Sequence, residues 1–145
     1  MNPEEQQIEH LSFDQLDRKV GFYVTHFVPG TLAETASNYT AFFVPEYPLQ
    51  IIAVRLRYTN PGSGGSGAAL QLTRTRPGST VNILASAFDL TQTANTTYTK
   101  RGRSLQNTTV LPDDFLAISG SGTLTNVQNI SLTIYCKPKG RGDYA

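Results

Sequence analysis

The segment LQIIAVRLRYT, residues 49–59, has the most regular alternation of apolar and polar residues in the chain. Such alternation is typical of a β-strand with one face in a core and the other toward solvent. It predicts one face formed by Ile52, Val54, Leu56 and Tyr58, and an opposite face formed by Ala53, Arg55 and Arg57. The glycine- and serine-rich segment that follows, NPGSGGSG, predicts a flexible loop.

Shorter segments with the same period of two lie on both sides of this strand. Turn sequences rich in Gly, Pro and Asn separate them, such as PGT at residues 29–31. Inward-pointing positions are predicted at Leu70, Leu72, Ile130, Leu132, Ile134 and Cys136. Strands are predicted at residues 20–28, 38–44, 68–75, 96–100, 105–111, 115–119 and 127–136, and residues 81–88 read as a buried strand or an irregular crossing. The series predicts an all-β fold, either a sandwich or a barrel.

The stretch LASAFDLTQTANTTYTK, residues 84–100, changes character along its length. Its first half holds small and apolar residues, and Phe88 and Leu90 are predicted to anchor it in the core. Residues 91–100 are almost entirely polar and predict a crossing followed by an exposed strand.

Residues 1–19 differ from the rest because they hold a large share of the acidic side chains. Asn2, Pro3 and Glu5 fit the start of a helix, but the apolar stripe is too sparse to hold a helix by itself. The stripe consists of Ile8, Leu11, Phe13 and Leu16. We therefore predict an extended or partly helical N-terminal arm at residues 1–19, a β domain at residues 20–138 and a flexible tail at residues 139–145.

Composition narrows the function classes. Charged residues make up 16% of the 145 residues and the net charge is +1, which disfavours a nucleic-acid partner because such binding needs a basic patch. The N-terminus lacks the apolar core of a signal peptide, and no apolar run is long enough for a membrane span. We expect a soluble protein, made in a cytoplasm, with no membrane contact.

Few residues offer chemistry. His10 lies in the arm, His26 reads as an ordinary sheet histidine, and Cys136 falls on an apolar strand face where a free thiol packs as a small hydrophobe. Asp113 and Asp114 form the only acidic pair outside the arm, and PDD reads as a turn before a strand, with a calcium ligand or a glycosidase pair as alternatives. The sequence therefore predicts no catalytic residue, no metal site, no cofactor and no enzyme activity.

Three segments span about two-thirds of the chain: IIAVRLRYTNPGSGGSGAALQLTRTRPGS, then ILASAFDLTQTANTTY, then VLPDDFLAISGSGTLTNVQNISLTIY. In this order they resemble segments of small structural proteins of tailed bacteriophages. Capsid decoration proteins, also called cement proteins, are of this kind, and the resemblance implies a β-sandwich of jelly-roll type that is usually a homotrimer. It also implies a location on the outer capsid surface of the virion. Residues 1–19 carry none of the resemblance.

The resemblance implies that the protein decorates and stabilises a capsid by binding across major capsid protein subunits. An arm that needs a surface to lie on suits this role. We predict that the arm contacts the capsid through Ile8, Leu11, Phe13 and Leu16. The alternative is a receptor- or sugar-binding domain of a tail or head fibre, with a site lined by Tyr39, Tyr47 and Tyr98.

Overall fold

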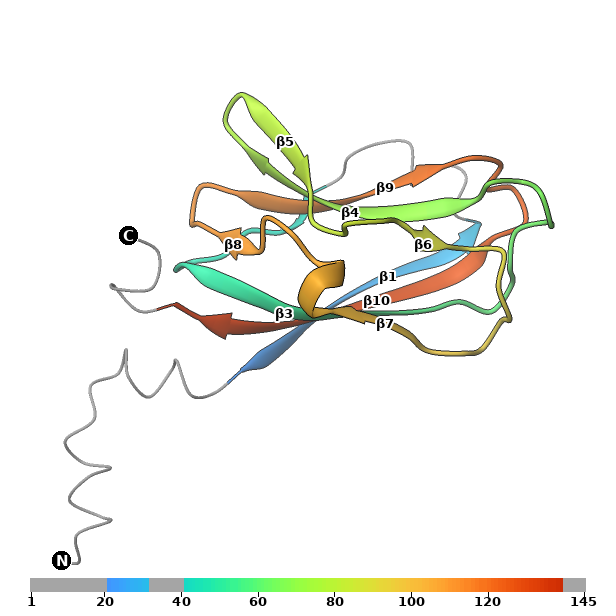
Figure 1. The fold of residues 1–145 in the computed structure, drawn as a ribbon, viewed down its shortest axis with the longest axis horizontal. Helices are drawn as coiled ribbons and strands as arrows, with labels where there is room; N and C mark the ends of the chain where they lie inside the picture. The colour runs from blue at the N-terminus through green and yellow to red at the C-terminus, as the bar shows by residue number, and fades with distance from the viewer. Residues whose placement is uncertain (1–20, 32–40, 140–145) are drawn as a thin grey trace, which may run out of the picture.

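The computed structural model describes residues 21–31 and 41–139, and these residues form two antiparallel β-sheets (Figure 1). Sheet A runs in the order β1 (Phe22–Thr31), β10 (Gln128–Pro138), β3 (Leu49–Arg57) and β7 (Tyr98–Arg101), and β8 (Thr109–Val110) also pairs with β3. Sheet B runs in the order β2 (Ala41–Phe43), β9 (Phe115–Ser121), β4 (Ala69–Arg76) and β5 (Ser79–Asn82), and β6 (Phe88–Asp89) also pairs with β4. The all-β prediction is confirmed.

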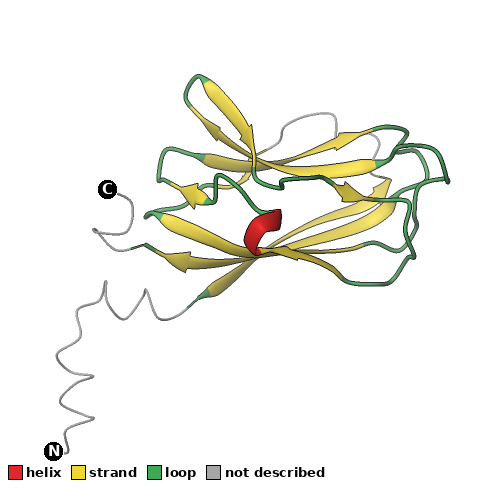
Figure 2. Cartoon of the chain, viewed as in Figure 1, coloured by secondary structure: helices red, strands yellow, loops and turns green. Residues whose placement is uncertain are grey.

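Strands make up most of the described part of the chain, and Figure 2 shows that its only helical element is a 3₁₀ turn, Gly102–Ser104. This turn lies between β7 and β8, which pair with different parts of the same edge of β3. The predicted strand at residues 105–111 is therefore reduced to the two residues of β8. The arm at residues 1–19 and most of the C-terminal tail lie outside the described residues, so the predicted domain boundaries stay predictions.

One apolar core lies between the two sheets. Strand β10 supplies it by strict alternation, with Ile130, Leu132, Ile134 and Cys136 all buried as predicted. From sheet B, Leu70 and Leu72 point into the same core, also as predicted. Burial of this apolar surface is the main term that stabilises the fold.

The predicted faces of residues 49–59 are wrong in the first half of the strand. Val54, Leu56 and Tyr58 are buried as expected, but Ile52 is 37% exposed and Ile51 takes its place in the core. The pairing of β3 with β10 skips one residue, because Ala53 faces Tyr135 while Ile51 faces Cys136. A bulge of one residue moves every side chain before it to the opposite face.

The predicted turn at residues 29–31 is also wrong, since β1 continues to Thr31. The pairing of β1 with β10 is irregular between Val28 and Thr31, and Gly30 there has a φ of 70°. The Gly30 N–H donates a hydrogen bond of 2.8 Å to the side-chain oxygen of Asn129. The Pro-Gly pair therefore forms a bulge within the strand, where the left-handed conformation suits glycine.

The polar stretch after β6 closes one end of the core. Phe88 and Leu90 are buried as predicted, and the Leu90 N–H donates to the Ala68 carbonyl at 2.9 Å. The hydroxyl of Tyr58 donates to the Gln92 carbonyl at 3.0 Å. The hydroxyl of Tyr98 donates to the Thr93 carbonyl at 2.7 Å. The backbone carbonyls of this stretch therefore satisfy two tyrosine hydroxyls, while the side chains of Gln92 and Thr93 are exposed to solvent.

Candidate interaction surface

Asp114, one of the two acids considered for catalysis, is buried and paired. Arg76 donates to both of its carboxylate oxygens, from Nε at 2.7 Å and from Nη2 at 2.8 Å. The Leu111 N–H donates to the same carboxylate at 2.8 Å. Burial alone would raise the pKa of Asp114, but the hydrogen bonds from Arg76 and Leu111 outweigh it and hold the pKa below its usual value. This carboxylate is a structural anion that joins β4 to the turn before β9.

A second arginine extends this link to the other sheet. Arg74 Nη1 donates to the carbonyls of Asn107 at 3.1 Å and Thr109 at 2.9 Å. Its Nε lies 4.0 Å from Asp114 and is buried without a hydrogen bond. Because Thr109 belongs to β8 of sheet A, Arg74 ties the two sheets together at this end.

The remaining reactive residue types have packing roles. His26 stacks on Phe42 with ring centroids 4.5 Å apart, which joins β1 of sheet A to β2 of sheet B. Burial lowers the pKa of His26, so its ring is neutral at neutral pH. Burial also raises the pKa of the Cys136 thiol to about 12, which leaves it protonated and inert. The predicted packing role of Cys136 is confirmed.

Within residues 21–31 and 41–139, no three His, Cys, Asp or Glu side chains gather in a way that could hold a metal ion. The same residues contain no helix long and apolar enough to cross a membrane. Two of the tyrosines proposed for a sugar site lie far apart: Tyr47 precedes β3, whereas Tyr98 pairs with Leu56 near its other end. Tyr39 lies outside the described residues. The structure therefore does not bring Tyr47 and Tyr98 into one site.

Sheet A has an outer face that carries exposed aromatic side chains at one edge. Tyr23 is 64% exposed and Phe27 is 56% exposed, and both lie on β1, the edge strand of this sheet. The Tyr23 ring lies 5.0 Å from the ring of Tyr135 on β10. Strand β1 contains no Lys, Arg, Asp or Glu. Charged side chains, proline and bulges are devices that discourage edge strands from pairing. In β1, Pro29 and the bulge at Gly30 protect the end of the strand, whereas residues 22–28 carry none of these devices.

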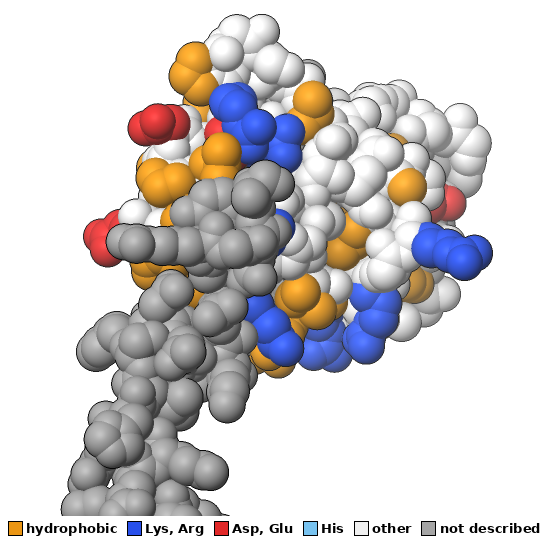
Figure 3. Space-filling model, turned by 60° about the vertical axis from the view of Figure 1, so that its left-hand side comes forward, with side chains coloured by type: hydrophobic (Ala, Val, Ile, Leu, Met, Phe, Trp, Pro, Cys, Tyr) orange, Lys and Arg blue, Asp and Glu red, His pale blue; other side chains and the backbone are white. Residues whose placement is uncertain are grey.

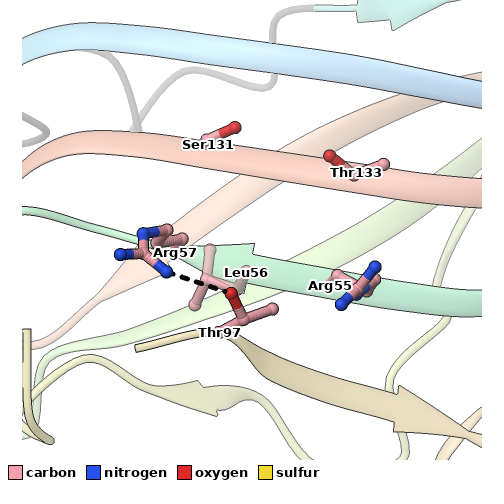
Figure 4. A pocket seen from close by; sticks show the side chains of 6 residues that line it. All are labelled: Arg55, Leu56, Arg57, Thr97, Ser131 and Thr133. Carbon is pink, nitrogen blue, oxygen red and sulfur yellow. Dashed lines mark hydrogen bonds between the residues drawn. The ribbon is translucent and has the colours of Figure 1, made fainter. Parts of the chain in front are cut away.

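The middle of the same face holds a shallow groove, which we call the arginine groove. It has a volume of about 220 Å³ and is lined by Arg55, Leu56, Arg57, Thr97, Ser131 and Thr133 (Figure 4). Arg57 donates one hydrogen bond of 3.3 Å to the Thr97 hydroxyl. The Arg55 side chain makes no hydrogen bond or ion pair with any other described residue. The groove therefore offers two guanidinium groups beside small hydroxyl side chains.

A second, apolar groove lies at the end of the molecule where β1 begins. Its volume is about 290 Å³, and its lining comes from the start of β1, from residues 43–47 and from the start of β3. Figure 3 shows hydrophobic side chains interspersed with Lys and Arg on this side of the molecule. The groove and the outer face of sheet A thus give the protein two places for apolar contact.

No protein-family model matches this chain, and no curated protein matches it. The resemblance to phage decoration proteins therefore stays a prediction carried by the three sequence segments. The predicted capsid contacts lie outside the described residues, namely Ile8, Leu11, Phe13 and Leu16.

Sequence reasoning found part of this surface and missed part. The alternation in residues 49–59 placed Arg55 and Arg57 on the outward face, which is confirmed. The same reasoning applied to β1 would have placed Tyr23 and Phe27 together on one face. The hydroxyl side of the groove comes from β10, more than 70 residues along the chain, and strand pairing alone brings it there.

Proposed function

We propose that this protein is a virion structural protein that decorates and stabilises a bacteriophage capsid by binding across major capsid protein subunits. It acts as a homotrimer on the outer capsid surface, without a cofactor and without contacting nucleic acid or a membrane. In this proposal sheets A and B form a sandwich of jelly-roll type, and residues 1–19 form an arm in front of it.

The observation that carries the proposal is the exposed aromatic surface of β1. A single apolar side chain at a protein surface is ordinary, but Tyr23 and Phe27 are both exposed on one face of an uncharged edge strand, and the half-buried Tyr135 packs beside Tyr23. Gathered exposed aromatics favour a surface that another protein covers. A rigid two-sheet body with such a face suits a protein that works by binding other subunits.

The arm supplies the capsid contact in this proposal. Each of its apolar side chains that buries about 100 Å² would contribute roughly 2.5 kcal/mol before the cost of ordering the arm. Four such residues, repeated on a lattice, would hold the protein firmly by avidity. The four are Ile8, Leu11, Phe13 and Leu16.

The first experiment locates the protein. Capsids of a phage that encodes this chain, with its gene deleted, are mixed with purified protein and imaged by electron microscopy. We expect density at repeated positions across capsid subunit boundaries. Density confined to a tail, or no binding to capsids, contradicts the proposal.

The second experiment tests the arm. Replacing its four apolar residues by Ser should abolish co-sedimentation with capsids and leave the β domain folded. The matched control replaces four polar arm residues by Ser and should bind normally: Gln6, Gln7, His10 and Gln15. Equal binding by both variants contradicts the predicted role of the apolar residues.

The alternative is a receptor- or sugar-binding domain of a tail or head fibre. The pair formed by Tyr23 and Tyr135 favours it, because exposed aromatic rings can stack on sugars beside polar side chains. Copy number distinguishes the two functions, since a decoration protein covers the shell and a fibre is present in a few copies. Loss of glycan binding on replacing Tyr23 by Ala, with capsid binding absent, would favour the fibre.

A further inference from the structure

Charge is distributed unevenly along this chain. Residues 1–17 contain no Lys or Arg and five acids: Glu4, Glu5, Glu9, Asp14 and Asp17. The described residues, 21–31 and 41–139, contain nine Lys and Arg against four Asp and Glu, a net charge of +5. The N-terminal segment and the β domain are therefore of opposite charge and attract one another.

The arginine groove holds part of this positive charge, because Arg55 and Arg57 are both exposed on one face of β3. The buried carboxylate of Asp114 pairs with Arg76, on sheet B, and no described acid forms an ion pair with Arg55 or Arg57. Two residues apart on one strand, these arginines are separated by about 6.5 Å along it. Guanidinium groups bind carboxylates through paired hydrogen bonds, and the hydroxyls of Ser131 and Thr133 add further donors.

The surroundings of the groove suit a segment that is both acidic and apolar. Phe27 pairs with Ser131, so its exposed ring lies on the strand beside the groove. Residues 4–9 carry three acids and also contain Ile8, the first apolar residue of the predicted stripe. Nucleic acid fits less well, because it needs a continuous stripe of basic side chains rather than one groove.

We propose that residues 4–9 of one copy of this protein lie in the arginine groove of a second copy. Glu4, Glu5 and Glu9 supply the carboxylates that Arg55 and Arg57 bind. The contact is head-to-tail, since the arm of each copy meets the sheet of the next, and it closes into a ring or continues as a chain. It leaves Leu11, Phe13 and Leu16 outside the bound segment and stands whether or not the protein binds a capsid.

The geometry at the start of β1 favours binding of residues 4–9 to the groove of a second copy over binding to the groove of the same chain. The Tyr135 ring lies directly over Gly21 on the outer face, so close that a Cβ at position 21 would overlap it. The ring of Tyr23 lies beside it. These two rings stand between the point where the arm leaves β1 and the groove of the same copy. The 11 residues from 10 to 20, between the bound segment and β1, can span up to about 36 Å, which allows them to reach a neighbouring copy.

The test is the mass of the full-length protein in sedimentation velocity, with circular dichroism confirming that each variant is folded. The groove variant is R55E/R57E, and the control R101E/R103E makes the same change of charge at exposed arginines outside the groove lining. The arm variant is E4K/E5K/E9K. A combined variant carries both sets of substitutions, so that the acidic groups lie in the groove and the basic groups in residues 4–9. R55Q/R57Q repeats the groove test without adding negative charge.

We expect the wild-type protein and R101E/R103E to associate with similar affinity. For the groove and arm variants, the protein concentration at which the assembly dissociates should be at least roughly tenfold higher than for the wild type. Combining the two variants should restore association. Raising the salt concentration should weaken the wild-type assembly. A wild-type protein that stays at its monomer mass of 15.8 kDa overturns the inference. So does a folded groove variant that associates normally, a control as weak as the groove variant, or a combined variant that does not recover.

Discussion

Replacing Asp114 by Asn removes the buried charge that joins β4 to the turn before β9. The carboxylate accepts hydrogen bonds of 2.7 and 2.8 Å from Arg76 and one of 2.8 Å from the Leu111 N–H. An amide has one oxygen and one NH₂ group, so at least one of these donors would face another donor. Arg74, whose Nε lies 4.0 Å from the carboxylate, would also lose its compensating charge.

The expected loss follows from this geometry. Removing one partner of a buried ion pair costs about 3 to 5 kcal/mol. The Arg76 side chain is 40% exposed and can regain water, which places the loss at the lower end. We expect D114N to lower the free energy of unfolding by about 3 kcal/mol and the melting temperature by roughly 10 °C.

Urea unfolding followed by circular dichroism measures this change. Asp113 is the matched control, because it is the neighbouring residue and is exposed, so D113N should change stability by less than about 0.5 kcal/mol. The lowered pKa of Asp114 adds a pH test. Its stabilisation is complete above the unfolded-state pKa of about 3.9 and disappears as the pH falls through the lower folded-state pKa. The gap between wild type and D114N should therefore be constant near neutral pH and close in acid.

Three results would refute this reasoning. D114N could lose less than about 1 kcal/mol, which would mean that the buried pair contributes no more than an exposed one. D113N could lose as much as D114N. The gap between wild type and D114N could also persist in strong acid, which would mean that its cause is not the charge of Asp114.

Further predictions concern the bulge, a tight turn and the thiol. Ile51→Ala should cost about 3 kcal/mol of unfolding free energy and Ile52→Ala less than about 1 kcal/mol, because only Ile51 is in the core. Gly122→Ala should destabilise by more than about 1 kcal/mol, since φ is 74° and the new Cβ would overlap the backbone of residue 67, whereas Gly64→Ala should be nearly neutral. Cys136 should resist iodoacetamide at about pH 8.5 until the protein is unfolded in guanidinium chloride.

Each of these predictions has a contradicting outcome. Equal losses for the two isoleucine variants in urea unfolding would place the bulge elsewhere in β3. A Gly122→Ala protein as stable as Gly64→Ala would mean that the turn relaxes without cost. Rapid alkylation of the folded protein would mean that the end of β10 opens often enough to expose Cys136.

Alternation in the sequence predicted which side chains are buried wherever a strand pairs regularly along both of its edges. In β10 every second residue is buried, because its partners β1 and β3 hold it in one register over most of its length. The pattern was misleading where one extra residue enters the ladder. Nothing in the run QIIAV says which isoleucine points inward, because both are equally apolar.

The interaction surface was only half predictable for a similar reason. Alternation places Arg55 and Arg57 outward, yet it cannot say that Ser131 and Thr133 lie beside them. The residue types of PDD predict a turn, and the Asp114 N–H closes that turn by donating to the Leu111 carbonyl. Nothing in the sequence indicates that Arg76 binds the Asp114 carboxylate. Both contacts join residues far apart in the chain, so they depend on the order of strands in each sheet.

By itself, the sequence determined the all-β class, the inward face of β10 and the opposite charges of the arm and the β domain. These are local properties, set by alternation and composition along the chain. Tertiary structure alone decided the bulge at Ile52, the burial of Asp114 and the arginine groove. Each depends on which strand lies beside which, and the sequence period of two is the same for any strand order.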